Sequence, residues 1–123
     1  MSRKTKPKPD RFLRQLAEAY LSEDTAERLS QARLNASMQL EDLAMHQPEA
    51  FWECLLLLLE RRPGLDTLVS LATPLTWLLR LHPDQFDERV AGLARRDSQM
   101  WDIVSAVDRD RIAPDVSAKL GSK

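Results

Sequence analysis

The sequence predicts an all-α protein, a single domain of about six or seven helices. The chain of 123 residues has only three glycines, whereas leucine, alanine, arginine, glutamate and glutamine, which favour helices, are abundant. Apolar residues recur at helical spacing through most of the chain, and there is no convincing strand alternation or hairpin signal. With 43% hydrophobic and 30% charged residues, the composition is that of a globular protein able to bury its own core.

The beginning of the chain differs from the rest in charge and polarity. The stretch SRKTKPKP has no apolar residue and alternates lysine with proline, so it cannot bury enough surface to offset the entropy of ordering it. We therefore expect residues 1–9 to be a disordered basic tail and residues 10–123 to form one helical domain. Residues 1–14 contain six Lys or Arg and one acid, giving +5, so residues 15–123 carry −6 of the overall −1.

Two stretches before residue 47 have helical patterns. Asp10 is a candidate N-cap for the first helix, which should end near Leu21 before a polar cluster. A second apolar stripe runs from about Ala26 to His46, and Asn35 either divides it or lies within one continuous helix. The first helix carries apolar residues at Phe12, Leu13, Leu16, Ala17 and Tyr20.

The segment Pro48–Arg62 predicts the central helix of the fold. Pro48 suits the first helical turn, and the apolar residues that follow leave only a narrow polar strip, so this helix needs neighbours on at least two sides. Its apolar run is far shorter than the roughly 20 residues that span a bilayer, so no membrane partner is expected. Leu57 falls within the polar strip between Glu53 and Glu60, and we expect it either to be covered by the N-terminal helix or to face a partner.

The remainder of the chain continues in short helices. Pro63 and Gly64 mark a strong stop after the central helix. The next apolar stripe is interrupted by Pro74, which predicts two short helices or one kinked helix. Asp97 is a candidate cap for a later helix. Pro83 and Asp84 begin a helix with one apolar stripe, the helix after Asp97 carries apolar residues from Met100 to Val107, and a short last turn runs from Pro114 to Leu120.

An offset of 35 residues aligns two helix pairs. Either the chain is a short HEAT-like solenoid of antiparallel helix pairs, or it is an irregular bundle in which two similar amphipathic helices happen to align. A stack of this kind would serve as a binding surface, with arginines along one edge. In the first helices of the two pairs, Pro48, Phe51 and Leu55 align with Pro83, Phe86 and Val90. In the second helices, Leu65 and Leu68 align with Met100 and Ile103. The arginines of the edge are Arg61, Arg62, Arg95 and Arg96.

Several short motifs carry a resemblance to a known family. They are the LEDLA of Leu40–Ala44, the PEAFWE of Pro48–Glu53, Pro74-Leu75 with Leu78-Leu79, Phe86–Val90, and Ala94–Asp97. Through these motifs, residues from about 35 to 120 resemble an uncharacterised family of small all-helical bacterial proteins, a domain of unknown function. The resemblance implies a helical fold and supplies no catalytic residue, cofactor or partner.

The reactive residue types form no catalytic or metal-binding motif. His46 and His82 lie near prolines that start helices, and they match no metal-ligand spacing with Cys54, the one cysteine. Cys54 is expected to be a buried and inert thiol. No phosphate-binding loop or serine nucleophile motif is present, and we expect no cofactor.

These observations favour a non-enzymatic module that binds another protein. The candidate contact residues are Leu57, Trp101, Glu53 and Glu60, whereas Trp52 and Trp77 are expected in the core. A small acidic body suits a bacterial inhibitor or immunity-type protein that occludes a basic partner. With no signal-peptide pattern in the sequence, the expected location is the cytoplasm.

Two other classes of function stay open. In one, a basic tail attaches the protein to nucleic acid through phosphate contacts, although the same tail is also explained as a solubilising segment. In the other, the protein is an enzyme that uses Glu53 and Glu60 as an acid–base pair. The candidate nucleic-acid-binding residues are Arg3, Lys4, Lys6, Lys8, Arg11 and Arg14.

Overall fold

A computed structural model describes residues 9–21 and 27–121, and within these ranges the protein consists of helices and short connections, with no strand. The predicted all-α class is confirmed, although the described residues form eight α-helices and a 3-10 helix rather than six or seven helices. No helix in these ranges is long and apolar enough to cross a membrane. The elements are α1 (Pro9–Tyr20), α2 (Glu27–His46), α3 (Pro48–Glu60), α4 (Leu65–Ser70), α5 (Ala72–Leu81), α6 (Pro83–Arg96), α7 (Ser98–Ser105), η1 (Arg109–Arg111) and α8 (Pro114–Leu120).

Several boundaries refine the sequence prediction. Helix α1 begins at Pro9, so the predicted N-cap Asp10 lies within the helix, and the rest of the predicted tail, residues 1–8, lies outside the described residues. Asn35 does not divide α2. Pro74 lies in the first turn of α5, where its missing N–H costs no helical hydrogen bond, so the break falls before α5. Asp97 caps α7 as predicted, accepting from the N–H groups at positions 99 and 100.

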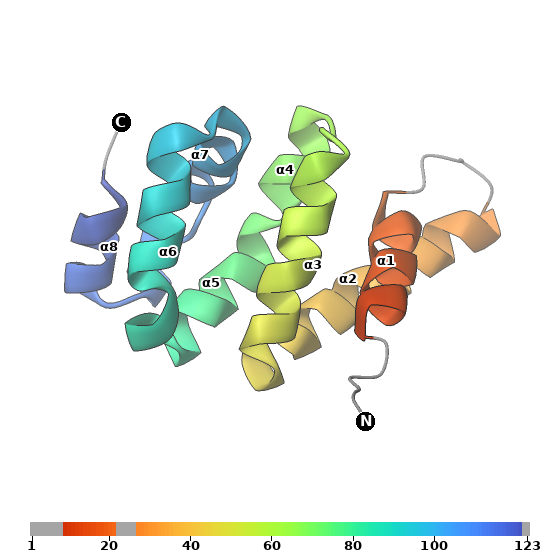
Figure 1. Cartoon of the computed structure of the whole chain (residues 1–123), viewed down its shortest axis with the longest axis horizontal. Helices are drawn as coiled ribbons and strands as arrows, with labels where there is room; N and C mark the ends of the chain where they lie inside the picture. Colours follow the sequence, from red (N-terminus) through yellow and green to blue (C-terminus); the bar gives the residue numbers. More distant parts are fainter. Residues whose placement is uncertain (1–8, 22–26, 122–123) are drawn as a thin grey trace, which may run out of the picture.

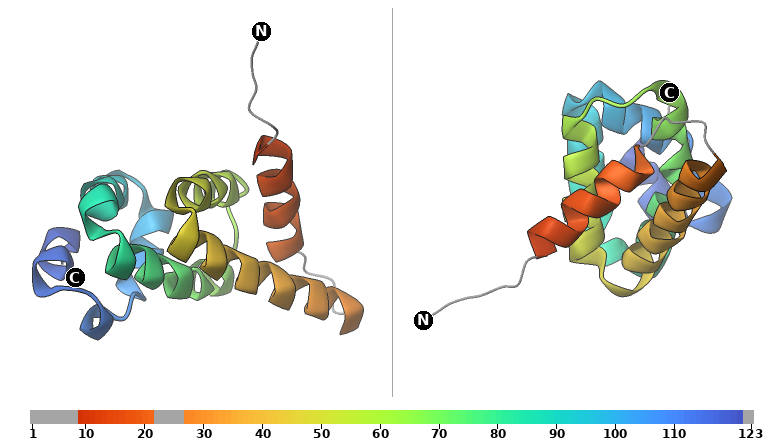
Figure 2. Two further views of the ribbon diagram at one scale, coloured as in Figure 1. Left: turned by 90° about the horizontal axis from the view of Figure 1, so that it is seen from below. Right: turned by 90° about the vertical axis from the view of Figure 1, so that its right-hand side faces the viewer.

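The helices form two layers along the longest axis of the molecule (Figure 1). Helices α3 and α6 lie side by side and run in the same direction, while α1 and α8 lie at opposite ends of the stack (Figure 1). Helices α2 and α5 pack against each other on the other side of α3 and α6, as the left view of Figure 2 shows. Helix α7 contacts both α4 and α6.

Helix α3 is the central element, as the sequence predicts. Its inward side chains, including Phe51, Leu55 and Leu58, are fully buried. It packs against both α1 and α2 on one side. On the other side the ring of Trp52 lies 5.8 Å from that of Phe86 in α6, measured between centroids. Helix α3 is therefore covered on several sides, which requires the apolar surface that its sequence supplies.

The two helices aligned by the 35-residue offset begin in the same way. Gln47 and His82 precede α3 and α6, with φ and ψ of −138° and 69° at the first and −133° and 50° at the second. Pro48 and Pro83 then occupy the first turns, and neither start has a side-chain cap. Because the proline and the backbone angles before it are shared, the chain enters both helices in the same conformation.

Burial agrees at some of the aligned positions and differs at others, since Leu68 and Ile103 in the second members are also both buried. Phe51 and Phe86 are both fully buried. In contrast, Leu65 of α4 is 60% exposed whereas its counterpart Met100 of α7 is fully buried. Helix α7 packs against both α4 and α6, so Met100 of α7 is buried, whereas the corresponding Leu65 of α4 is left exposed.

Polar contacts attach the C-terminal helix to the stack. Lys119 Nζ of α8 lies 2.8 Å from Oδ2 of Asp87 in α6, whose side chain is only 8% exposed. Arg109 donates hydrogen bonds to the backbone oxygens of Ser117 at 3.1 Å and Gly121 at 2.9 Å. The hydrogen bond from Lys119 holds the pKa of Asp87 below its ordinary value, against the opposing effect of desolvation.

Replacing Lys119 with methionine should lower the thermal stability at neutral pH, because Asp87 then keeps its buried charge without the ammonium partner. The folded-state pKa of Asp87 is depressed. The pair therefore stabilises the protein fully above about pH 3.9, the ordinary pKa of aspartate, and this stabilisation is lost as the pH falls through the lower folded-state pKa. The melting-temperature difference between wild type and Lys119→Met should therefore shrink from about pH 7 to about pH 2. Lys119→Arg serves as the charge-retaining control, and a difference independent of pH would contradict this account.

Candidate protein-binding surface

An apolar groove runs between α1 and α2 at one end of the stack. It consists of two adjoining hollows of about 270 and 350 Å³, and Phe12 and Gln39 line both of them. The first hollow extends past Gln15 and Asn35 along the two helices, and the second reaches Ala50 at the start of α3. Phe12 therefore lies between two adjoining hollows, which together are called the groove below.

The position of Phe12 on its helix explains why it is open. Leu13, Leu16 and Ala17 face the core and are buried, whereas Phe12 lies at the edge of this apolar stripe and is 48% exposed. On α2, Met38 is 62% exposed. An aromatic ring exposed in the centre of a groove has the properties of a binding anchor, because its burial by a partner removes a large apolar area from water.

The groove is nearly uncharged. Among its described lining residues, Asp42 is the one ionised side chain, and the other polar groups are the amides of Gln15, Asn35, Gln39 and Gln47. Amides of this kind can donate and accept hydrogen bonds without the desolvation cost of a full charge.

The predicted contact residue Leu57 is half-buried. It is partly buried against the core and lines a shallow hollow with Arg14 and Glu18 of α1, so the N-terminal helix covers it. Its neighbour Leu56 on the same helix is 38% exposed. Of the two alternatives for Leu57, cover by the N-terminal helix is the one that this arrangement favours, and Leu56 is the more exposed of the two leucines.

Glu53 and Glu60 are exposed on α3, as predicted from their shared strip. Neither carboxylate forms an ion pair with another described residue. Glu49 on the same helix does, since its carboxylate accepts two hydrogen bonds of 2.9 Å from Arg89 of α6. The outer face of α3 thus presents two carboxylates that are available to a basic partner.

The tryptophans lie against the core. Trp52, Trp77 and Trp101 are all partly buried and packed on the main cluster of buried side chains. This agrees with the prediction for the first two and gives Trp101 less exposed surface than a protruding anchor would have.

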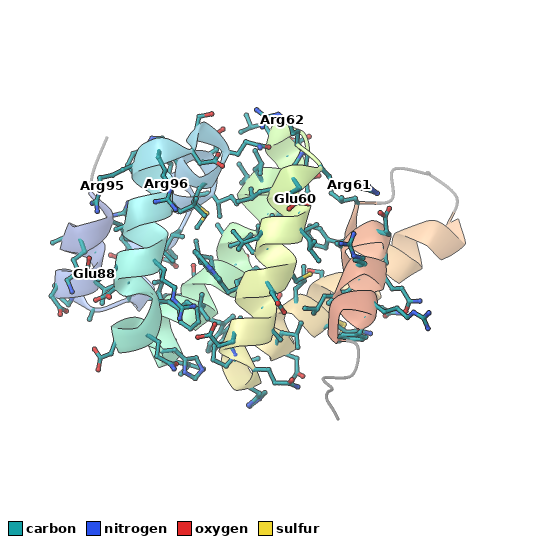
Figure 3. The ribbon with its side chains drawn as sticks, viewed as in Figure 1. Glu60, Arg61, Arg62, Glu88, Arg95 and Arg96 are labelled. Carbon is teal, nitrogen blue, oxygen red and sulfur yellow. The ribbon has the colours of Figure 1, made fainter. Side chains whose placement is uncertain are left out.

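The predicted arginine edge exists, but its members are not equivalent. Arg61, Arg62, Arg95 and Arg96 lie near the same ends of α3 and α6 (Figure 3). Arg61 forms an ion pair with Glu18 of α1, and Arg96 donates to the carbonyl oxygen of Gly92 within its own helix at 3.2 Å. Basic residues at helix C-termini also stabilise the helix dipole, so this edge is explained without a ligand.

The residues considered for catalysis do not converge. Glu60 shares its shallow hollow with arginines and Glu18, and no histidine is among the described lining residues. His82 Nε2 is 2.8 Å from the carbonyl oxygen of Met45, a contact that joins two helix ends. No group of three potential metal ligands occurs within the described residues.

The basic residues predicted to contact nucleic acid are only partly within the described ranges. Arg11 and Arg14 are exposed on α1, and Arg14 lies beside Glu60 in the shallow hollow. Arg3, Lys4, Lys6 and Lys8 lie outside the described residues.

Comparison of the chain with known protein families found no matching family, and comparisons with curated proteins and solved structures likewise found no match. The resemblance inferred from the helix-start motifs therefore stays a prediction. The groove at Phe12 and the exposed Leu56 were missed in the sequence, where the only signal was that each lies at the margin of an apolar stripe.

Cys54 is predicted to be unreactive while the protein is folded. Its side chain is fully buried, its Sγ lies 3.7 Å from the carbonyl oxygen of Leu13, and burial raises the thiol pKa to about 12. At about pH 8 the folded protein should react with a disulfide reagent such as DTNB at least about a hundredfold more slowly than the same protein in denaturant, because the thiolate is the reactive form. Similar rates in the two states would show that the thiol is accessible.

Proposed function

We propose that this chain is a non-enzymatic helical module that binds another protein through the groove between α1 and α2. The observation that supports the proposal is the exposed ring of Phe12, which lies between two adjoining hollows rather than alone on a convex surface. Grooves between helices commonly receive an apolar helix or loop, in which a few side chains provide most of the binding energy.

The charge distribution favours a partner that is apolar at the groove and basic around it. Asp42 lies in the groove, while Glu53 and Glu60 present unpaired carboxylates on α3 within the described part of the chain. Residues 15–123 together carry −6. Complementary charge accelerates association, so an inhibitor or immunity-type protein that covers a basic partner is the narrower form of this proposal.

The architecture supports the same class of function. Two parallel helices with the same proline start, α3 and α6, are the basis for proposing a short HEAT-like stack. Stacks of this kind extend a surface across several helices and commonly bind other proteins. We place the protein in the cytoplasm and in the small bacterial family that its motifs resemble, as parts of the same proposal.

Photo-crosslinking tests the groove directly. A chain with p-benzoylphenylalanine in place of Phe12 should form a covalent adduct with its partner when irradiated in native lysate at low salt. The same analogue in place of Leu81 is the matched control, because Leu81 is 47% exposed compared with 48% for Phe12 and does not line the groove. Phe12→Gln should weaken recovery of the crosslinked protein by at least about tenfold, whereas Leu81→Gln should not.

Equal adduct formation from positions 12 and 81 would show that the groove is not the binding surface. Recovery unchanged by Phe12→Gln would have the same meaning. Absence of any stoichiometric partner in the wild-type experiment would contradict protein binding as the function.

A second candidate function is nucleic-acid binding through the basic N-terminal region. The observation that favours it is the exposure of Arg11 and Arg14, three positions apart on α1 and directly after the four other basic residues. Such a contact would act through phosphates and would weaken steeply with salt.

Deleting residues 2–8 should abolish a salt-sensitive mobility shift of DNA or RNA if this second function is correct, since four of the six basic residues are removed. A variant with the same residues in scrambled order is the control, because it retains the charge and should retain the shift. An unchanged shift after the deletion, or no shift with the full chain, would contradict nucleic-acid binding.

A further inference from the structure

A separate pocket of about 290 Å³ lies between α5 and the turn at η1. Its walls are formed by Thr73, Thr76, Trp77 and Arg80 of α5 and by Asp108 and Arg111. The four residues of α5 recur at spacings of three and four positions, which places them on one face of that helix. This pocket shares no lining residue with the groove at Phe12.

The pocket contains more positive than negative charge. Two arginines from different elements, Arg80 and Arg111, line it, and Asp108 supplies the one carboxylate among its lining residues. That carboxylate is already engaged, because Oδ2 accepts from Arg111 Nε at 3.1 Å and Oδ1 accepts from the N–H of Asp110 at 3.1 Å. Arg80 forms no ion pair with any described carboxylate.

Both guanidinium groups retain donors for a ligand. The bond from Arg111 to Asp108 uses Nε, so the two terminal nitrogens remain for another acceptor. Arg80 lies with Cζ 5.7 Å from the centre of the Trp77 ring, a cation–π contact that orients the guanidinium without using its N–H groups. Carboxylate and phosphate oxygens match the paired donors of arginine.

The remaining walls are apolar or neutral. Trp77 is partly buried, so its indole is held by the core and presents a flat surface beside Arg80. The hydroxyl of Thr76 donates its hydrogen to the carbonyl oxygen of Ala72 at 2.7 Å, so the hydroxyl oxygen can only accept a further hydrogen bond. Because Arg80 lies over one face of the indole, a flat ligand body would contact the part of the ring beside the guanidinium while its anionic group reaches the arginines.

We propose that this pocket binds a small molecule in which a carboxylate or phosphate group is attached to a flat, apolar body. Arg80 and Arg111 bind the anionic group, and Trp77 contacts the body. This ligand site is independent of the proposed protein-binding groove, since it lies on other elements and uses opposite chemistry: charge recognition in place of apolar burial.

Benzoate and phenyl phosphate are suitable probes, with inorganic phosphate and benzyl alcohol as the anion-only and body-only comparisons. Each is titrated into the full-length protein while the indole N–H resonances are followed by NMR, with Trp77 assigned through Trp77→Phe. Benzoate or phenyl phosphate should shift the Trp77 resonance saturably and leave those of Trp52 and Trp101 unchanged. The stronger of the two identifies whether the site prefers a carboxylate or a phosphate.

Arginine variants test the charge recognition. Arg80→Gln and Arg111→Gln should each weaken binding of the preferred probe by about tenfold or more, because each removes a charge-assisted hydrogen bond. Arg95→Gln is the matched control, since it removes an exposed arginine of α6 that does not line the pocket and should leave binding unchanged. Thermal melts of all variants verify that they are folded.

Trp77→Leu tests the flat surface, with binding measured by isothermal titration calorimetry because this variant lacks the Trp77 resonance. The substitution should reduce binding of phenyl phosphate to the level of inorganic phosphate while leaving inorganic phosphate itself unaffected. The proposal is overturned if no probe shifts Trp77, if benzyl alcohol binds as well as the anions, or if Arg95→Gln weakens binding as much as the two pocket variants.

Discussion

The burial of α3 is the constraint on which the other features of this protein depend. Phe51, Leu55 and Leu58 are fully buried, so neighbouring helices must pack on several sides of one helix. Helices α1 and α2 cover one flank, α6 covers the other through Phe86 and Trp52, and the side chain of Gln99 in α7 donates to the carbonyl oxygen of Leu59 at 3.3 Å. The rest of the chain is arranged outward from this helix in both directions.

An arrangement that extends in two directions has two ends, and the ends differ. At one end α8 docks Val116 and Leu120 into the core and is held by Lys119, so little apolar surface is left open. At the other end, α1 and α2 pack on α3 without a further described helix beyond them, and Phe12 and Met38 stay exposed. The open end is where the geometry favours a protein partner.

The two candidate sites have different physical chemistry. The groove at Phe12 is lined by apolar groups and amides, so affinity there would come mainly from removing apolar surface from water. The pocket beside Trp77 contains two arginines, so affinity there would come from charge-assisted hydrogen bonds. Neither site was predicted from the sequence, because each combines residues from two helices or from a helix and a turn whose proximity no local pattern records. Of the predicted contact residues, Glu53 and Glu60 remain on an exposed surface.

The sequence by itself determined the all-α class, the central helix, the proline starts of α3 and α6, the cap at Asp97 and the burial of Cys54, since these follow from local propensity and helical periodicity. Only the tertiary structure decided which residues at the margin of an apolar stripe are covered by a neighbouring helix. Leu57 lies in the polar strip of its helix and is covered by α1, while Leu56 lies nearer the apolar side and is more than a third exposed. The physical reason is that periodicity orients a side chain around its own helix axis, whereas its burial depends on where the neighbouring helix crosses.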